Sequence, residues 1–164
     1  LTAVGNGRYP LHAGFTPPGA QHLPEHRDEH MKLAAGLTET CYQMYARQRT
    51  GLASEFVRFG NSGMEIGAPH NLLRPETAES LFYMWRFTKD IKYREWGWRM
   101  FLAFEKHCRL PGGGYVGIKN VNAEMSPKGE TMETFWLTGP RPAKRIINST
   151  KIDMPSSDTP NQME

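Results

Sequence analysis

Apolar residues recur at helical spacing in the segment that follows Pro24. Ala34, Leu37, Cys41 and Met44 lie three or four positions apart, and acidic residues are concentrated before them. Such spacing places these side chains on one face, because an α-helix has about 3.6 residues per turn. With Pro24 near a first-turn position, the pattern predicts an amphipathic helix of about five turns.

The helical spacing stops after this segment, and glycines become frequent. Gly51, Gly60, Gly63 and Gly67 divide the sequence into pieces too short for a helix. We therefore expect a long loop with a short turn at residues 54–57. Loops of this length in a compact chain tend to carry functional residues.

A second helical pattern starts at Pro75. The proline ring suits the first position of a helix, and it biases the preceding residue towards extended backbone. Ala78, Phe82 and Trp85 then form one apolar stripe. Residues 88–90 are expected to form a short polar connection to the next helix.

A third helical pattern follows this connection directly. Its stripe consists of Trp96, Met100, Phe104 and His107. Because the connection is short, the second and third helices are expected to pack antiparallel as an αα-hairpin. Most of their aromatic rings would then pack the helix pair together.

The remaining segments predict little regular structure. A glycine-rich turn precedes a short β-type run at residues 115–118, and a brief helix starts near Thr131. Residues 1–24 are expected to be irregular, and residues 138–164, with four prolines and no aromatic residue, to be disordered. The folded part, residues 25–137, is therefore predicted to be all-α with one short β-type hairpin segment and disordered ends.

The composition fits a globular domain without a basic surface stripe. The chain has 164 residues, of which 38% are hydrophobic and 23% charged, enough for one ordinary core. Its net charge is +3, but acidic and basic residues alternate, so we expect no nucleic-acid partner. No run of about 18 apolar residues predicts a membrane span. The two cysteines, Cys41 and Cys108, form neither a disulfide framework nor a metal motif.

Charged residues gather at the start of the second helix. Glu76 lies at the positive end of the helix dipole, which favours its ionised form by about 0.3–1 kcal/mol. Glu79 lies one turn further on the same side. An oriented carboxylate of this kind can act as a general base on water or as an outer ligand of a metal-bound water. The alternative is that both are ordinary first-turn acids and that Arg74 is a surface charge.

The motifs around this helix resemble a known family of glycosidases. R-P-E-T-A-E-S, W-G-W, G-G-Y and M-E-T-F-W-L occur in this order after residue 73. Together they are similar to the C-terminal third of class I α-1,2-mannosidases, glycoside hydrolase family 47. The stretch from His30 to Phe59 resembles the segment just before it, and the resemblance covers about residues 25–137.

The resemblance implies a fold, a cofactor and a set of functional residues. The family fold is an (αα)7 barrel, of which this chain would form a fragment, and a calcium ion at the bottom of its cavity binds the terminal mannose. Glu76 would be the general base in an inverting hydrolysis of α-1,2-linked mannose. Arg74 and Phe135 would contact the sugar, and Glu79 would hold calcium-bound water.

The sequence also departs from the family pattern. The family's acid catalysts and the calcium-ligating threonine of its T-E-A-H-P motif have no counterpart in this chain, which we therefore expect to be inactive by itself. Cys41 resembles one half of the family disulfide, and Gly14 stands near the place of the other half.

The resemblance further implies partners and a location. The substrates would be high-mannose N-glycans of glycoproteins in the Golgi or endoplasmic reticulum lumen. Members of the family are type II membrane proteins, so membrane attachment is expected only through an N-terminal anchor outside this chain. Two other functions remain open: a non-catalytic mannosidase-like glycan-binding protein in glycoprotein quality control, and an αα-repeat interaction module.

Overall fold

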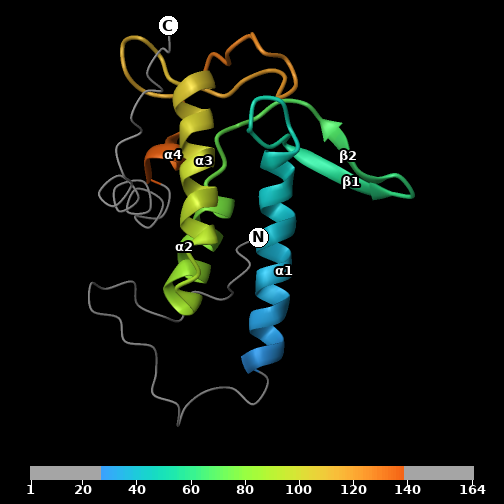
Figure 1. The fold of residues 1–164 in the computed structure, drawn as a ribbon. Coiled ribbons are helices and arrows are strands. Elements are labelled where there is room, and N and C mark those ends of the chain that lie inside the picture. Colours follow the sequence, from blue (N-terminus) through green and yellow to red (C-terminus); the bar gives the residue numbers. More distant parts are fainter. Residues whose placement is uncertain (1–26, 139–164) are drawn as a thin grey trace, which may run out of the picture.

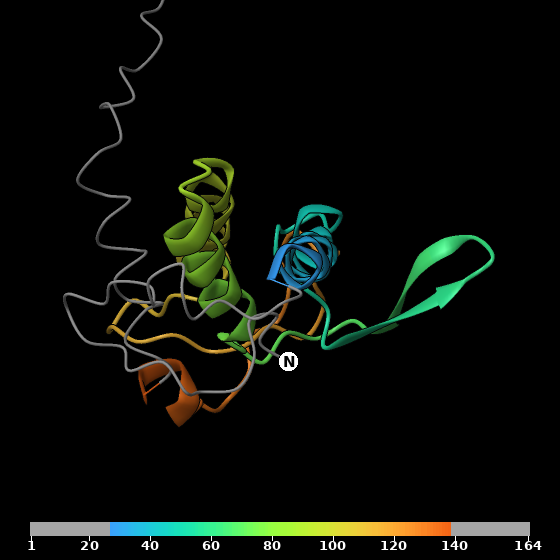
Figure 2. The same ribbon diagram turned by 90° about the horizontal axis from the view of Figure 1, so that it is seen from below.

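The structure, a computed structural model, describes residues 27–138 of the chain (Figure 1). Its elements are, in chain order, α1 (Arg27–Ala46), β1 (Phe56–Gly60), β2 (Gly63–Ala68), α2 (Glu76–Thr88), α3 (Lys92–His107) and α4 (Thr134–Thr138). The body is formed by α1, α2 and α3, and the β1–β2 hairpin extends away from it (Figures 1 and 2). The described part is therefore helical with a small two-stranded sheet. The predictions for residues 1–24 and for the tail beyond residue 138 lie outside it.

Helix α1 is confirmed, but of the predicted stripe only Ala34 is buried. The buried residues of α1 are Ala34, Thr38, Tyr42 and Tyr45. Leu37, which the apolar stripe places in the core, is 48% exposed. The ring of Tyr42 instead stacks on Trp96 of α3, with the ring centroids 4.4 Å apart. Large amphipathic tyrosine rings thus decide which face of α1 is buried, because each covers more surface than a leucine.

Thr38 is a polar residue within this buried face. Its side chain is fully buried, and its hydroxyl has no hydrogen-bond partner among the described residues. An unpaired buried hydroxyl costs about 1–3 kcal/mol, and valine has nearly the same shape. We expect Thr38→Val to raise the free energy of unfolding by about 1 kcal/mol, measured by chemical denaturation. A lower value in the variant would contradict this and would show that the hydroxyl makes a bond in solution.

The glycine-rich segment after α1 contains a β-hairpin, so the predicted loop with a turn at residues 54–57 is wrong. Strands β1 and β2 pair antiparallel, with Val57 opposite Ile66. At the turn between them, Gly63 has a φ of 100°, a value that glycine adopts readily and other residues do not. The glycines indicate the turn, but the aromatic and β-branched residues between them favour strands.

The αα-hairpin of α2 and α3 is confirmed, but α2 begins at Glu76, one residue later than predicted, because Pro75 is its N-cap rather than its first helical residue. The two helices run antiparallel (Figure 1). The buried residues of α2 are Ser80, Leu81 and Met84. The predicted stripe of Ala78, Phe82 and Trp85 is only partly buried at the edge of the core. Because α2 contacts α1 as well as α3, its buried face is turned towards both helices.

The segment after α3 folds back towards the start of α2. The predicted β-type run at residues 115–118 forms single bridges rather than a strand, and Ile118 pairs with Asn71 just before α2. Helix α4 starts at Thr134, slightly later than predicted. Its Trp136 ring packs 4.6 Å from the ring of Phe104 on α3. These contacts tie the C-terminal part of the described chain to the αα-hairpin.

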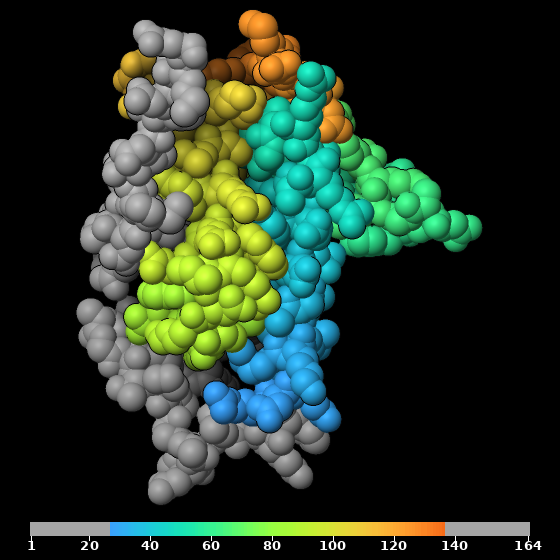
Figure 3. Space-filling view, viewed as in Figure 1, coloured from blue at the N-terminus to red at the C-terminus, as the bar shows by residue number. Residues whose placement is uncertain are grey.

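The described part has an uneven outline. The space-filling view shows α1 beside α2 and α3, with the β1–β2 hairpin standing out to one side (Figure 3). Within residues 27–138, no helix is long and apolar enough to cross a bilayer. The charged residues singled out in the sequence lie in the body, where the chain enters α2.

Candidate active site

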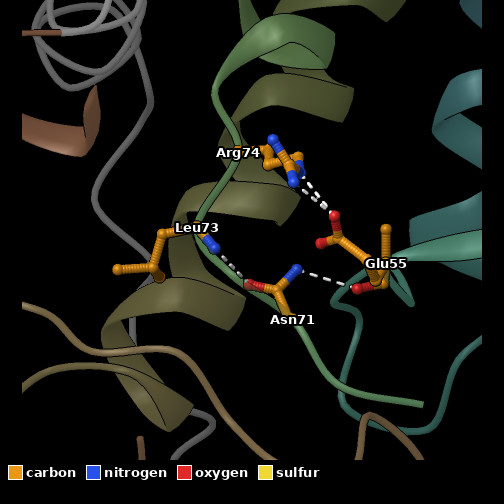
Figure 4. Close-up of polar contacts among 5 residues, drawn as sticks. Glu55, Asn71, Leu73 and Arg74 are labelled. Carbon is orange, nitrogen blue, oxygen red and sulfur yellow. Dashed lines mark hydrogen bonds and ion pairs between the residues drawn. The ribbon is translucent and has the colours of Figure 1, made fainter. Parts of the chain in front are cut away.

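One buried side chain holds the segment that leads into α2. Asn71 is only 4% exposed. Its Nδ2 donates to the carbonyl oxygen of Ala53 at 2.8 Å, and its Oδ1 accepts the backbone N–H of Leu73 at 2.9 Å (Figure 4). Leu73 itself has a left-handed φ of 62° and a fully buried side chain. Because that conformation costs about 1–2 kcal/mol for a residue other than glycine, the surrounding contacts must stabilise it.

Arg74 extends from this segment towards the residue that precedes β1. Its Nη2 and Nε lie 2.5 Å and 2.7 Å from Oε1 of Glu55 (Figure 4). The hydrogen bond to Glu55 raises the pKa of the Arg74 guanidinium above its already high usual value. The backbone of Arg74 is held as well, because the Tyr45 hydroxyl donates to its carbonyl oxygen at 3.4 Å. Arg74 is therefore oriented by α1 and by the approach to β1.

The structure brings Phe135 of α4 close to Arg74. The guanidinium carbon of Arg74 lies 6.0 Å from the centroid of the Phe135 ring, at the outer limit of a cation–π contact. Glu133, just before α4, adds its charge to those that raise the pKa of Arg74. Two residues that the sequence predicts to bind one ligand thus lie side by side.

Glu76 and Glu79 occupy the first turn of α2, and both are half-buried. Burial raises the pKa of the Glu79 carboxyl, and the charge of Glu76 raises it further. Tyr83, one turn on, has its pKa raised by burial and then by Glu79. The two carboxylates thus lie close enough to repel each other, as their spacing along the helix predicts.

These carboxylates fit part of the coordination of a hard cation. Carboxylate oxygens are ligands that Ca2+ prefers, but the ion takes about 6–8 oxygens. Among residues 27–138, no three His, Cys, Asp or Glu side chains come together as a metal site would need. The carboxylates of Glu76 and Glu79 thus supply only part of the oxygens that such an ion takes.

Sequence reasoning missed Glu55, Asn71 and Glu133. Glu55 lies in a glycine-rich segment that was predicted to be a loop, and Asn71 looks like an ordinary turn residue. Glu133 falls within M-E-T-F-W-L, a motif in which only the phenylalanine was singled out. The only available signal for Glu55 was an acidic residue inside a long loop, where functional residues concentrate.

The assembled groups suit a ligand that carries many hydroxyls. Arg74 can donate to hydroxyl oxygens, while Glu55, Glu76 and Glu79 can accept from hydroxyl groups. The Phe135 ring offers an apolar surface of the kind that packs against a sugar ring. Carboxylates, a guanidinium and an aromatic ring thus lie together around one helix start, and paired carboxylates are what most glycoside hydrolases use for catalysis.

The chain belongs to glycosyl hydrolase family 47, whose family model matches residues 12–139. It is 39% identical over 177 residues to the endoplasmic reticulum mannosyl-oligosaccharide 1,2-alpha-mannosidase of Rattus norvegicus, covering 97% of this chain and 27% of the rat protein. The Homo sapiens protein of the same name is 46% identical over 117 residues, covering 66% of this chain and 17% of that protein.

A solved structure shares the fold. The alpha-1,2-mannosidase from Trichoderma reesei matches with a TM-score of 0.64 and 23% sequence identity, covering 80% of this chain and 30% of that one. At this identity the similarity concerns the fold alone. The chain spans less than a third of the length of each of these relatives.

The two cysteines are free thiols in the described part of the chain. Burial raises the pKa of Cys108 to about 12, so this residue is an unreactive part of the core. Burial also raises the pKa of Cys41. Gly14, which stands near the place of the family's other disulfide cysteine, lies outside the described residues.

Proposed function

We propose that this chain carries part of the active site of an α-1,2-mannosidase that removes mannose from high-mannose N-glycans of glycoproteins. The observation that carries the proposal is the first turn of α2, where Glu76 follows the oriented Arg74 in a chain of family 47. The relatives named mannosyl-oligosaccharide 1,2-alpha-mannosidase support the choice of substrate.

In this proposal, Glu76 is the general base. Its half-buried carboxylate takes a proton from a water molecule as the oxygen of that water attacks the anomeric carbon of the terminal mannose. In an inverting glycosidase the base and the acid stand about 6.5–9.5 Å apart, so that the water fits between the base and the sugar. As the water attacks, the bond between the anomeric carbon and the leaving oxygen breaks, and the leaving oxygen takes a proton from the acid. We assign no residue of this chain as that acid, and Glu76 holds the proton of the attacking water.

Arg74 and Phe135 bind and orient the sugar. The guanidinium donates to sugar hydroxyls while Glu55 keeps it in place, and the Phe135 ring packs against the apolar face of the mannose. Because Arg74 uses both Nε and Nη2 towards Glu55, its plane is fixed before the sugar arrives. Such preorganisation lowers the cost of ordering the site on binding.

Replacing Arg74 with lysine tests this orientation. A lysine ammonium cannot reproduce the two contacts that Nε and Nη2 of Arg74 make to Oε1 of Glu55, so we expect Arg74→Lys to lower kcat/KM for mannose release by about tenfold. Arg109→Lys is the matched control, because Arg109 makes a single exposed contact to Glu105 at 3.0 Å outside the site. Equal rates in the two variants would contradict the orienting role of Arg74.

A calcium ion would supply a point of attachment for sugar hydroxyls, and we propose that Glu79 holds water bound to it. Because burial and Glu76 raise the pKa of Glu79, its carboxyl binds a proton more tightly in the folded than in the unfolded state. Stability therefore falls as the pH rises from the unfolded pKa through the folded one. At neutral pH the ionised carboxylate costs stability, and a nearby cation would offset that cost.

Glu79→Gln tests this linkage without an activity assay. Without calcium, the variant should melt at a higher temperature than the wild type at neutral pH. The difference should shrink as the pH falls through the raised folded pKa of Glu79 and should be small below about 4. Added calcium should raise the melting temperature of the wild type more than that of the variant, measured against EDTA. Equal calcium shifts in both proteins would argue against Glu79 as a calcium-site residue.

We further propose the architecture and location that go with this function. Helices α1, α2 and α3 would be consecutive helices of an (αα)7 barrel, with neighbouring helices covering exposed residues such as Leu33 and Leu102. The protein would act in the endoplasmic reticulum lumen, in line with the names of the rat and human relatives, or in the Golgi lumen. A type II anchor would supply membrane attachment.

The function is tested by mannose release. The chain, and the longest natural form of the protein that contains it, are incubated with α-1,2-mannobiose and with a high-mannose N-glycan, with calcium or with EDTA. Calcium-dependent release of mannose is the expected result for the longest form. Binding without hydrolysis would instead indicate a glycan-binding protein. If the protein neither binds nor hydrolyses the glycan, the αα-repeat interaction module is the remaining alternative.

A further inference from the structure

We infer that Asn71 is a positioning residue that sets the geometry of Arg74 and Glu76 without touching the sugar. The inference rests on the proposed function, because it explains how the same site is held in shape. Its basis is the set of bonds that the buried Asn71 makes to two separate segments of the chain.

The amide of Asn71 links the two segments that carry the ion pair. Its Nδ2 donates to the carbonyl oxygen of Ala53, two residues before Glu55. Its Oδ1 accepts the N–H of Leu73, the residue before Arg74. One side chain therefore fixes the backbone next to each partner of the Arg74–Glu55 pair, as Figure 4 shows.

The backbone of Asn71 is itself held on the other side. Its N–H donates to the carbonyl oxygen of Ile118 at 2.9 Å, and its own carbonyl oxygen accepts the N–H of Ile118 at 3.1 Å. Gly117 lies so close that a Cβ atom there would clash with the carbonyl oxygen of Asn71. Asn71 thus has little freedom to move, which suits a residue that sets the position of others.

The bond from Oδ1 of Asn71 also stabilises the conformation of Leu73. Without this bond the left-handed backbone of Leu73 loses a buried partner, and a leucine prefers φ values below zero. A change of φ at Leu73 would turn the following peptide. The carbonyl oxygen of Arg74 would then leave the Tyr45 hydroxyl, and its guanidinium would leave Glu55. Replacing Asn71 would thus affect sugar binding and hydrolysis indirectly, through the displaced Arg74 and through Glu76 at the start of α2.

Thr50, three residues before Ala53, provides a matched control. Its buried Oγ1 donates to the carbonyl oxygen of Val121 at 2.7 Å and accepts the N–H of Leu52 at 3.3 Å. The pattern is the same as at Asn71: one bond to a distant carbonyl and one to the N–H two residues on. Thr50→Val removes such a pair of bonds but none of the hydrogen bonds described for Asn71 and Arg74, so it separates general destabilisation from positioning.

The experiment compares Asn71→Ala, Asn71→Ser and Thr50→Val with the wild type. Mannose release is measured in the longest natural form that contains this chain, with kcat and KM determined separately at a temperature where all proteins are folded. In parallel, the Nε–H signal of Arg74 is followed by 15N NMR in the 164-residue chain, because its ion pair with Glu55 shifts that signal and slows its exchange with water.

Asn71→Ala is expected to lower kcat at least tenfold and to abolish the distinct Arg74 Nε–H signal, whereas Thr50→Val leaves both near wild type. Asn71→Ser, whose hydroxyl can still accept the Leu73 N–H, should recover part of both. Equal kcat values and an unchanged Arg74 signal in Asn71→Ala and Thr50→Val overturn the inference. A wild type that releases no mannose overturns the proposed function instead, and the NMR signal then still decides whether Asn71 sets the position of Arg74.

Discussion

Replacing Glu76 with glutamine is expected to lower kcat for mannose release by about 10²–10⁴-fold and to leave KM nearly unchanged. The amide has the size and hydrogen-bonding shape of the carboxylate, but it cannot accept the proton of the attacking water. The start of α2 should stay intact, because the Ser80 hydroxyl bonds the backbone oxygen of Glu76 rather than its side chain. The measurement is a steady-state assay on α-1,2-mannobiose.

Glu95→Gln is the control for this substitution. Glu95 also lies in the first turn of a helix, α3, and its side chain is exposed. The same chemical change there should alter kcat less than twofold, since a surface residue away from the site makes no contact with the transition state. If the Glu76→Gln variant kept kcat within tenfold of the wild type, Glu76 would not be the general base, and the interaction-module alternative would be favoured.

Adding a methyl group at Gly117 is expected to destabilise the fold by about 3 kcal/mol. The new Cβ would clash with the carbonyl oxygen of Asn71, a backbone atom that cannot turn away as a flexible side chain can. Relieving the clash would break the pair of hydrogen bonds between Asn71 and Ile118. The segment that leads into α2 would then separate from the one that follows α3. Urea denaturation of Gly117→Ala against the wild type measures the loss.

Gly112→Ala separates this clash from the general effect of replacing a glycine. A Cβ at Gly112 would meet no other atom within 4 Å, and we expect the free energy of unfolding to change by less than about 0.5 kcal/mol. If Gly117→Ala behaved like Gly112→Ala, the close approach of residues 71 and 117 would not exist in solution, and the fixed position of Asn71 would lose its support.

The sequence predicts where the helices start and end better than which faces they bury. Pro75 fixes the start of α2 through its ring geometry, which is a local effect. The buried face of α1 depends instead on its neighbours: the Tyr42 ring is drawn inwards by stacking on Trp96, and Leu37 is left outside. The buried face is therefore set by tertiary contacts, and the residue spacing within α1 alone cannot predict it.

The β1–β2 hairpin shows a second limit of sequence reasoning. Its glycines suggested a loop, yet pairing across the turn satisfies the backbone groups of both strands, and Val57 lies opposite Ile66. Glycines beside such short stretches of strand-forming residues favour a loop, and only pairing with a partner strand decides between a loop and a strand.

The candidate site can be proposed from the sequence where it rests on a local motif. Arg74, Glu76 and Glu79 follow from the start of one helix, and the resemblance to family 47 added Phe135. Glu55 and Asn71 could not be found this way. Glu55 meets Arg74 across 19 positions of the chain, and the role of Asn71 exists only because Ala53 and Leu73 meet in space.

The measurement that tests the central claim most directly is 1H NMR of the mannose first released from α-1,2-mannobiose by the longest natural form that contains this chain. If Glu76 activates a water on the face opposite the leaving group, the first product is β-mannose, which then equilibrates slowly with the α anomer. α-Mannose as the first product would make the enzyme retaining and would contradict Glu76 as a general base. No release of mannose would contradict the proposed enzyme itself.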